Sequence, residues 1–598
     1  MSKTRETFSN IFYVLKFCFK HCPLYTFFIL SNKAMNDSNT YFKHTFMIMF
    51  LIDIIQFGRP VWHGLAILAF SITYETIIGF WNRYFRHKIN PAAEAKLNNQ
   101  IRLELYAKVE TVDLECYDNP DYYTNFVWAM NEAWDRMKKN LDTCTTLVSC
   151  IVAFLLTGLL ILFFDIFGLL FVAVSFVATF LINFVINKLK FNLDVAIRPL
   201  QRKRDYINRV FYLNDFSKEI RLYNVKEKLF ADFDATNKEI IHVTNRHTKR
   251  IAILNFVRGY VFGDLIMNGL YVLYLLYQTI VRSVMGYGAM VALFQSVWRM
   301  RQSIQNFVGI VPEFRQHSMY IQRLREFLDY QVKITDASNA AGVPEALSAI
   351  EIKNLTFSYS VHKEPILKNI NMTINPGDKI ALVGYNGAGK TSFIKLLMRL
   401  YDPTYGEVLY GGKNIKEYKI ECYRNLFSTI FQDYQLFAAT IRDNVAMGTA
   451  VDEAAITDAL DKSGFGARLA ALPNGLDTFI TKEFEQSGVN FSLGESQKIA
   501  ISRVLYKNSN IIILDEPSSA LDPIAEDNLN RTMLEHSGDK TVIFISHRLS
   551  TTKNCDMIYM FDEGCIVERG THDELMARGG KYHEMFVMQA EKYVLYKV

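Results

Sequence analysis

Residues 384 to 391 have the types and the spacing of a loop that binds phosphate. An apolar run from Lys379 to Gly384 is typical of a buried strand, and the residues after it match the pattern GxxxxGK[ST]. Glycines let backbone N–H groups converge on phosphate oxygens, and a helix that starts after the loop adds positive potential. We therefore expect Lys390 to neutralise the β and γ phosphates of a nucleotide and Thr391 to hold Mg²⁺. The loop consists of Gly384, Tyr385, Asn386, Gly387, Ala388, Gly389, Lys390 and Thr391.

A second apolar run places two carboxylates where phosphate chemistry needs them. The segment from Ile511 to Leu514 is typical of a buried strand, and Asp515 and Glu516 follow it directly. In that position one carboxylate is suited to a water bound to Mg²⁺ and the other to a general base. The phosphate loop alone is shared by many nucleotide-binding proteins, whereas the second strand adds the groups needed for hydrolysis.

The chain around these motifs has two unlike parts. Its 598 residues are 50% hydrophobic, 14% aromatic and 21% charged, and they allow roughly four domain-sized units. The hydrophobic excess lies before about residue 310, while the remainder alternates like a soluble α/β protein. A formal net charge of +5 argues against a protein that coats nucleic acid. The eight cysteines are scattered without a CxxC pair, so neither a zinc site nor a disulfide framework is indicated.

The first part is expected to be an all-α transmembrane domain over residues 1 to 330. An interfacial amphipathic helix at about 5 to 22 precedes six spans, each judged against the roughly 20 apolar residues of a bilayer crossing. The residues from Ser31 to Asn39 are too polar for lipid, so they must face a water-filled cavity or lie outside the hydrocarbon layer. The expected spans cover residues 24 to 57, 61 to 84, 143 to 163, 165 to 187, 252 to 281 and 285 to 310.

The connections between these spans indicate the orientation in the membrane. The connections after the second and fourth spans are long and rich in Lys and Arg, which places them in the cytoplasm. They are rich in helix formers, so pairs of spans are expected to continue as long helices beyond the membrane. Residues 331 to 348 lose hydrophobic periodicity and form a linker, and residues 349 to 598 form the α/β P-loop domain.

Seven motifs in their usual order show that the chain resembles exporter-type half-transporters of the ATP-binding cassette family. The resemblance covers nearly the whole chain. A soluble cassette protein of translation or DNA repair is an alternative that the six expected spans disfavour, and no nucleic-acid partner is expected. The motifs are Tyr359 in LTFSYS, the phosphate loop, Gln432 in FQD, FSLGESQK from Phe491 to Lys498, Asp515-Glu516, the loop Ser519-Ala520-Leu521-Asp522, and His547 in ISHRLS.

The resemblance implies a role for each motif, with ATP and Mg²⁺ as ligands. Tyr359 would stack on adenine, and Glu516 would orient and deprotonate the attacking water. Gln432, Thr391 and Asp515 would complete the Mg²⁺ shell, and His547 would contact the γ-phosphate. Two chains would build each site, because the signature closes over the phosphate from the opposite subunit. The remaining residues implied for ATP binding are Asn386, Gly387, Ala388, Gly389 and Ser392. The signature residues are Ser492, Gly494 and Glu495. The loop that follows the two carboxylates contributes Ser519, Ala520, Leu521 and Asp522.

Two further features concern the partner and the coupling between domains. Leu493 stands where the family's LSGGQ signature has its first glycine, and its side chain either crowds the phosphate or turns away. Crowding would favour a heterodimer, and turning away would allow a homodimer, which is the simpler reading. Two segments in the long cytoplasmic loops look like the family's coupling helices, which would dock into a groove on the cassette. They contain Asn119, Pro120 and Asp121 in the first loop, and Glu219 and Arg221 in the second.

The expected function is ATP-driven export by alternating access between two six-span domains in a lipid bilayer. The polar first span favours an amphipathic, bacteriocin-like peptide as substrate, while a lipid or a hydrophobic drug is the alternative. An ATP-gated channel or a regulatory cassette is a third possibility, which the intact Glu516 and His547 disfavour. The half-size chain suggests a bacterial plasma membrane, with the N-terminus and the cassette in the cytoplasm. The charges of Glu75, Asp264 and Arg299 inside spans must face protein or water.

Overall fold

The computed structural model describes residues 3–359, 364–516, 531–535, 537–546 and 549–594. The chain forms two compact units, and each of them combines segments that are distant in sequence. The first unit contains Met1–Glu110 and Asp121–Tyr330, and the second contains Thr111–Pro120 and Gln331–Val598. A short piece of the first cytoplasmic loop therefore belongs to the same unit as the phosphate loop.

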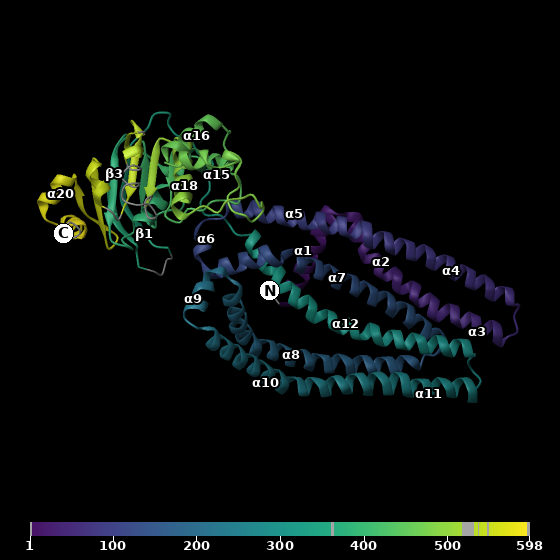
Figure 1. Ribbon diagram of the computed structural model, residues 1–598. Coiled ribbons are helices and arrows are strands. Elements are labelled where there is room, and N and C mark those ends of the chain that lie inside the picture. Colours follow the sequence, from purple (N-terminus) through teal and green to yellow (C-terminus); the bar gives the residue numbers. More distant parts are fainter. Residues whose placement is uncertain (1–2, 360–363, 517–530, 536, 547–548, 595–598) are drawn as a thin grey trace. The chain divides into compact units, whose positions relative to one another are not determined.

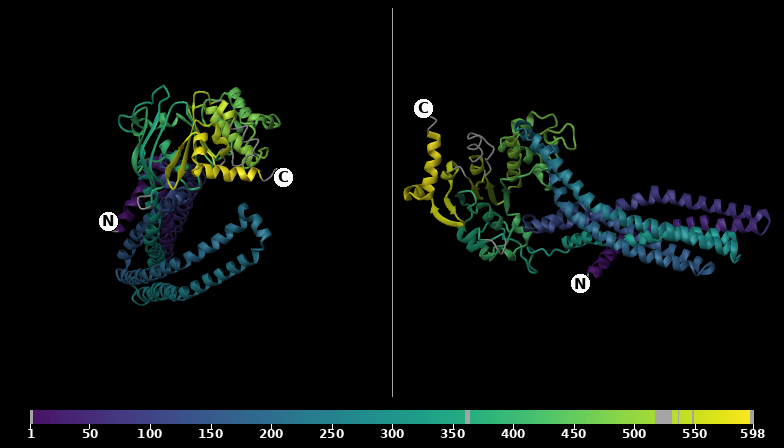
Figure 2. Two further views of the ribbon diagram at one scale, coloured as in Figure 1. Left: turned by 90° about the vertical axis from the view of Figure 1, so that its left-hand side faces the viewer. Right: turned by 90° about the horizontal axis from the view of Figure 1, so that it is seen from below.

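The first unit is built from helices, several of them very long (Figure 1). Helices α7 and α8 have 45 residues each, which gives a length of about 68 Å, more than twice the roughly 30 Å of a bilayer's hydrocarbon core. Helix α8 runs beside α10, and α12 runs beside α3 (Figures 1 and 2). The helical elements are α1 (Lys3–His21), α2 (Pro23–Tyr41), η1 (Phe42–Met47), α3 (Ile48–Gln56), α4 (Val61–Tyr84), η2 (Phe85–Ile89), α5 (Asn90–Thr111), α7 (Pro120–Phe164), α8 (Gly168–Tyr212), η3 (Asn214–Phe216), α9 (Ser217–Leu222), α10 (Lys226–Phe256), η4 (Val257–Leu270), α11 (Tyr271–Leu276), η5 (Tyr277–Val281) and α12 (Tyr287–Leu328).

Four helical stretches among the described residues are long and apolar enough to cross a membrane. They extend well beyond the apolar segments that the sequence marks, because each continues into a polar helix. The helices over 23–56 and 287–328 are not among the four, so the first and sixth spans stay predictions. The four stretches are Val61–Thr111, Tyr122–Phe164, Gly168–Tyr212 and Lys226–Val281.

Charged side chains within these helices pair with charges on neighbouring helices. The Lys43 ammonium lies 2.5 Å from the Glu75 carboxylate, and the Arg301 guanidinium lies 2.5 Å from the Asp264 carboxylate. The Arg299 guanidinium lies 5.9 Å from the centre of the Tyr41 ring. Pairing between helices therefore explains why Glu75 and Asp264 are tolerated inside predicted spans, and no role in substrate binding is needed.

The second unit contains two sheets whose strands run in different patterns. In the four-stranded sheet, the order β2-β1-β4-β5 is antiparallel throughout. In the six-stranded sheet, the order is β10-β9-β3-β8-β7-β6, and all neighbours are parallel except β10 and β9. The strands are β1 (Ile350–Phe357), β2 (Leu367–Ile374), β3 (Lys379–Gly384), β4 (Tyr405–Tyr410), β5 (Lys413–Asn414), β6 (Phe427–Ile430), β7 (Ile511–Asp515), β8 (Thr541–Ile545), β9 (Met557–Asp562) and β10 (Cys565–Gly570).

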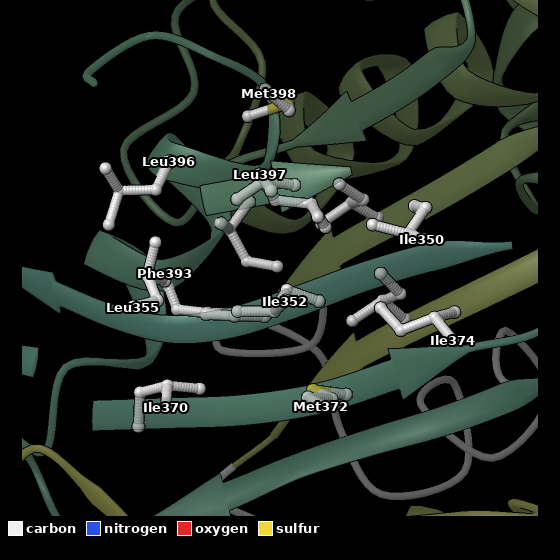
Figure 3. Packing of buried hydrophobic residues seen from close by; sticks show 14 of the residues in the cluster. Ile350, Ile352, Leu355, Ile370, Met372, Ile374, Phe393, Leu396, Leu397 and Met398 are labelled. Atoms are coloured by element: carbon white, nitrogen blue, oxygen red, sulfur yellow. The ribbon is translucent and has the colours of Figure 1, made fainter. Parts of the chain in front are cut away.

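Helices cover these sheets and complete the unit. Helix α13 begins at the end of the phosphate loop, and the apolar residues of its buried side pack against β1 and β2 (Figure 3). Strands β3 and β7 read as continuous apolar runs because they are buried on both faces. The helical elements are α6 (Glu115–Asp118), α13 (Lys390–Leu397), η6 (Ile415–Glu417), α14 (Ile420–Arg424), α15 (Ile441–Ala446), α16 (Glu453–Lys462), α17 (Gly466–Ala470), η7 (Gly475–Asp477), α18 (Leu493–Lys507), η8 (Leu549–Asn554), α20 (His572–Arg578) and α21 (Lys581–Val594).

The segment Thr111–Pro120 is held in the second unit by polar and apolar contacts. The buried carboxylate of Asp113 accepts hydrogen bonds from the backbone N–H groups of Lys333 at 2.7 Å and Ile334 at 3.1 Å. The Tyr401 hydroxyl donates to the Asp118 carboxylate, and Leu114 packs against the core that α13 shares with the sheets. This segment and the start of the linker are thus fixed to the same surface.

Candidate functional site

The predicted catalytic groups meet at one edge of the six-stranded sheet. Strand β3 ends at Gly384 where the phosphate loop begins, β7 ends at Asp515, and β6 ends two residues before Gln432. These strands are parallel, so their carboxyl ends lie along the same edge. Residues from all three form a pocket of about 410 Å³. The pocket is lined by Ile366, Asn386, Gly387, Ala388, Gly389, Lys390, Thr391, Ser392, Gln432 and Glu516.

Glycines shape the phosphate loop at positions that reject a side chain. Gly384 has a φ of 148°, and a Cβ there would collide with the backbone oxygen of Phe561 in the adjacent strand β9. Gly389 has a φ of 99° and stands at the N-cap of α13. A left-handed residue at this point turns the chain from loop to helix, so the first N–H groups of α13 face the pocket.

Lys390 is buried with its charge directed back at the loop. Only 6% of its surface is exposed, and its ammonium donates to the carbonyl oxygens of Gly384 at 2.9 Å and Tyr385 at 3.1 Å. Burial lowers the pKa of Lys390, and the nearby carboxylates of Glu516 and Asp515 oppose this shift only in part. A phosphate in the pocket would add negative charge beside this ammonium.

Asp515 has one carboxylate oxygen that is held and one that is not. Its Oδ2 accepts a hydrogen bond of 2.9 Å from the Thr391 hydroxyl, while the buried Oδ1 has no hydrogen-bond partner. Burial raises the pKa of Asp515 to about 6. Thr391 and the Asp515 Oδ1 are oxygen ligands of the kind that Mg²⁺ prefers beside phosphates, so these residues fit a magnesium ion.

Glu516 and Gln432 face each other across the pocket. The Gln432 amide donates to the Glu516 carboxylate at 3.0 Å. Glu516 has a φ of 52°, and its backbone N–H donates to the Ile545 oxygen at 2.9 Å. This unusual backbone conformation at a non-glycine residue turns the chain sharply after β7 and brings the Glu516 side chain into the pocket lining. A carboxylate beside an amide can hold a water molecule and accept its proton.

Tyr359 is connected to the phosphate-loop helix but does not line the pocket itself. Its hydroxyl lies 2.9 Å from the Ser392 hydroxyl, one residue after Thr391. Its ring meets the Tyr401 ring edge-on, with centroids 5.3 Å apart. The side chain is partly exposed, and the Lys395 ammonium lies 5.9 Å from its ring centre. An aromatic face beside the triphosphate pocket is a suitable platform for a base.

The signature residues begin helix α18 and are joined to each other. The Ser492 hydroxyl accepts a bond from the Glu495 backbone N–H at 3.3 Å, and the Glu495 carboxylate accepts from the Ser492 N–H at 2.9 Å. These bonds and Arg468, at 2.9 Å from the same carboxylate, lower the pKa of Glu495. Leu493 is 69% exposed, so its side chain turns to solvent in the single chain. Gly494 lies in the first turn of α18, whose N-terminus offers an anion site.

The two predicted coupling segments lie in different units. Asn119 caps α6, and Pro120 starts α7 beside it, both within the second unit. Asp121 begins the next part of the first unit. Glu219 and Arg221 lie on the short helix α9, where the Arg221 guanidinium donates to the Ser217 backbone oxygen at 2.8 Å.

Some predicted residues lie outside the described residues, and some residues of the site were not predicted. His547 and the loop Ser519-Ala520-Leu521-Asp522 belong to the first group. Ile366, Tyr401 and Asp113 belong to the second: Ile366 lines the pocket, Tyr401 contacts Tyr359, and Asp113 holds the linker. An isoleucine just before a strand, a lone tyrosine or an aspartate in a loop carries no pattern that marks such a role in one sequence.

Comparisons with known proteins agree with this geometry. A family model described as ABC transporter matches residues 367–519. The subtilin transport ATP-binding protein SpaT of Bacillus subtilis is 28% identical over 526 residues, which is 87% of this chain and 83% of SpaT. An ATP-dependent lipid A-core flippase of Haemophilus ducreyi is 34% identical over 304 residues, covering 50% of this chain and 51% of the flippase.

The fold of the whole chain also has a counterpart among solved structures. A bacterial Atm1-family ABC exporter with ATP bound superposes with a TM-score of 0.75 at 21% identity, covering 94% of this chain and 97% of the exporter. Most of the curated relatives are matched over a smaller share, since the chain spans 63% of one and about half the length of several others. The fold is therefore shared over the full chain, and the sequence similarity is concentrated in part of it.

Proposed function

We propose that this chain is an exporter of the ABC transporter family, which hydrolyses ATP to drive a substrate across a membrane. Its fold is that of a bacterial ABC exporter. The observation that carries the proposal is the pocket at the sheet edge. It brings together a buried lysine, a hydroxyl bonded to a carboxylate, and a glutamate bonded to a glutamine amide. Those groups suit phosphate binding, metal binding and activation of water, in that order.

Each residue of the pocket has a defined part in this proposal. The backbone N–H groups of the loop and the Lys390 ammonium bind the phosphates, and Tyr359 stacks on the base. Thr391, Asp515 and Gln432 would hold Mg²⁺, which neutralises charge on the phosphates when bound. Glu516 orients the attacking water with Gln432 and accepts its proton. His547 would donate to the γ-phosphate, and the loop Ser519-Ala520-Leu521-Asp522 is proposed as a further part of the nucleotide site.

The proposed assembly is a dimer of two half-transporters, because the signature must reach a phosphate in the other subunit. Ser492, Gly494 and Glu495 would close over that phosphate with the N-terminus of α18. The exposed side chain of Leu493 supports a homodimer, since it leaves the first turn of α18 uncrowded. A heterodimer with an altered second site is the alternative.

We propose an amphipathic peptide as the substrate, exported from the cytoplasm or the inner leaflet. The support is the likeness to a subtilin transport protein over most of both chains, together with polar residues in the first helices. The likeness to a lipid A-core flippase makes a lipid the alternative. A bacterial plasma membrane, with the cassette and the N-terminus in the cytoplasm, suits the Lys-rich and Arg-rich loops.

The segments around Asn119–Asp121 and Glu219–Arg221 are proposed to transmit the nucleotide state to the spans. The contacts of Asp113 and Asp118 support this role for the first segment, because they attach it to the surface near Tyr401 and the linker. Nucleotide binding must favour one of two arrangements for this transmission to occur.

The test is ATP hydrolysis by the chain expressed alone and reconstituted in lipid. Glu516→Gln keeps the shape of the side chain and removes the base, so we expect hydrolysis to fall about a hundredfold or more while Mg·ATP binding is retained. Glu421→Gln, at an exposed position of α14, serves as the matched control. Substantial hydrolysis by Glu516→Gln would refute the role of Glu516. Binding without hydrolysis by the unaltered chain would point to a second, different half-transporter.

A further inference from the structure

A polar cavity lies inside the helical unit, far in sequence from the nucleotide motifs. Its volume is about 630 Å³, within the range of small-molecule and peptide sites. Three helical stretches contribute to it, each with residues spaced by three or four positions and therefore on one face. The polar pocket is lined by Ile29, Asn32, Lys33 and Asn36 from α2, by Asn82, Phe85, Arg86, Asn90 and Glu94 from α4, η2 and α5, and by Lys138, Asp142 and Thr145 from α7.

The polar pocket accounts for the unusual polarity of the first predicted span. Asn32, Lys33 and Asn36 belong to the run that is too polar for lipid, and all three line the pocket. Facing a cavity is one of the two positions expected for this run, the other being outside the hydrocarbon layer. Polar groups at membrane depth are costly unless they are paired or serve a purpose, so the lining calls for an explanation.

Many of the lining groups satisfy one another. The Lys138 ammonium lies 2.8 Å from the Glu94 carboxylate, which also accepts from the Asn90 amide at 2.9 Å. Asn36 and Asn82 exchange hydrogen bonds of 3.1 Å and 2.5 Å through their side chains. These pairs hold the walls of the pocket together, and they leave no net charge between Lys138 and Glu94.

Three polar groups of the lining are available to a ligand: one cation, one anion and one neutral acceptor. Within the described residues, the exposed side chains of Arg86 and Asp142 make no hydrogen bond or ion pair, although the ammonium groups of Lys138 and Lys33 act on Asp142 from nearby. The Lys33 ammonium donates to the Thr146 hydroxyl at 2.7 Å. The Oδ1 atom of Asn32 is buried and has no hydrogen-bond partner. The pocket therefore presents a cationic donor, an anionic acceptor and a neutral acceptor, and each would gain from a ligand group of the complementary kind.

We propose that the polar pocket binds a peptide segment that carries an ammonium and a carboxylate close together. The ammonium donates to Asp142 and to the Asn32 Oδ1, and the carboxylate accepts from Arg86. This inference rests on the proposed export of a peptide and names the feature by which the helical unit recognises it. A ligand with only one sign of charge would form a charge-assisted hydrogen bond with only one of Arg86 and Asp142.

A peptide suits the lining better than a zwitterionic lipid headgroup does. The Asn32 Oδ1 has no partner, and the side-chain amides of Asn36, Asn82 and Asn90 each have a second N–H beyond the one that they donate within the lining. These amide groups donate and accept as peptide bonds do. A headgroup has no amide to meet them, whereas the backbone flanking a charged residue has one at every position. The apolar residues Ile29 and Phe85 give the same pocket an apolar wall for an amphipathic segment.

The test measures binding of a defined probe to the full chain in nanodiscs of phosphatidylcholine and phosphatidylglycerol. The probe is an amphipathic peptide of Leu, Ala, Ser and Gln that ends in a lysine with a free carboxylate and bears a neutral fluorophore on its N-terminus. One variant peptide ends in a carboxamide, and another ends in norleucine in place of the lysine. Fluorescence anisotropy should show that each variant peptide binds about tenfold more weakly than the probe.

Substitutions in the chain test whether Arg86 contacts the peptide carboxylate and whether Asp142 contacts the peptide ammonium. Arg86→Gln should weaken the probe about tenfold and should not weaken the carboxamide peptide further, because the carboxylate is already absent. Asp142→Asn should behave in the same way towards the norleucine peptide. Arg83→Gln on α4 and Asp135→Asn on α7 are exposed controls of the same residue types, and both should stay within about twofold of the unaltered chain.

The outcomes separate this inference from the proposed function. Intact ATP hydrolysis without probe binding, or with binding that ignores both charges, would overturn the peptide pocket and leave the hydrolysis proposal standing. Phosphatidylethanolamine retained by the purified chain and lost in Arg86→Gln, with no binding of the probe, would assign the pocket to a lipid headgroup and would equally overturn the proposal. Retained hydrolysis in both pocket variants would show that they fold.

Discussion

Charged side chains are used differently in the two units of this protein. In the helical unit, Glu75 and Asp264 each pair with a basic residue of a neighbouring helix. In the second unit, Lys390 donates to two neutral carbonyls, and one oxygen of Asp515 has no hydrogen-bond partner. The charges in the helical unit are neutralised by neighbouring side chains. The charges at the phosphate loop would gain a full set of partners only when a ligand binds. A buried charge therefore indicates a site when the fold leaves it without its complement.

The largest effect should come from removing the charge at the phosphate loop. Lys390→Ala deletes the ammonium that we propose contacts two phosphates, so the affinity for Mg·ATP should fall about a thousandfold, which is about 4 kcal/mol. Titration calorimetry on the full chain measures it, with Lys419→Ala at an exposed position as the control. If the affinity of Lys390→Ala for Mg·ATP stayed within about tenfold of that of the unaltered chain, Lys390 would not differ from the paired charges of the helical unit in its need for a ligand.

Asp515 should make the stability of the ligand-free chain depend on pH. Its folded pKa of about 6 lies above the ordinary value of 3.8, so the unfolded state releases the proton first and folding loses free energy as pH rises between these values. The loss should reach about 3 kcal/mol above pH 6. Chemical unfolding of the unaltered chain and of Asp515→Asn should show the difference between them growing from pH 4 to pH 7. Mg·ATP should bind more tightly over the same rise, because its binding favours the ionised carboxylate.

A smaller loss should follow when a pair in the helical unit is broken. Arg301→Gln leaves the Asp264 carboxylate without its ion partner, and because 51% of that side chain is exposed the free energy of unfolding should fall by only about 1 kcal/mol. Adding Asp264→Asn should recover most of the loss, since no charge then remains. Thermal unfolding in detergent compares both with Arg250→Gln, an exposed change on α10. If the double variant were less stable than Arg301→Gln, the pair would not be the reason for the loss.

The smallest effect is expected at the altered position of the signature. Leu493→Gly removes a side chain that is 69% exposed, so the rate of ATP hydrolysis should change less than about twofold. Steady-state hydrolysis by the reconstituted chain tests this expectation. A rise of tenfold or more would show that Leu493 crowds the second subunit's phosphate, and it would favour a heterodimer.

The sequence predicted the nucleotide site in more detail than the helical unit, for a physical reason. Backbone approach to phosphate tolerates few residue types, so Gly384, Gly389 and Lys390 stand at fixed spacings that one sequence reveals. Helix packing tolerates many residue types, so the partners of Glu75 and Asp264 left no pattern. The same holds for Asp113, whose role depends on a linker far away in sequence.

The polar residues of the first predicted span show which features could be predicted from the sequence and which required the structure. Their types excluded lipid, and that inference required only the cost of burying polar groups. The identity of the helices that complete the pocket required the fold, because Arg86 and Asp142 are distant from Asn32 in sequence. Composition therefore predicted either a cavity or a position outside the hydrocarbon layer, and only the structure supplied the lining of the pocket.

The discontinuity of the second unit matters for anyone who wishes to dissect or recombine this protein. A gene fragment beginning at Gln331 would encode the cassette without Thr111–Pro120, and the apolar surface that receives Leu114 would be exposed to water. The backbone N–H groups of Lys333 and Ile334 would also lose their carboxylate acceptor. Chimaeras that exchange cassettes should therefore carry both segments together, since the natural module does not coincide with the stretch of chain after the linker.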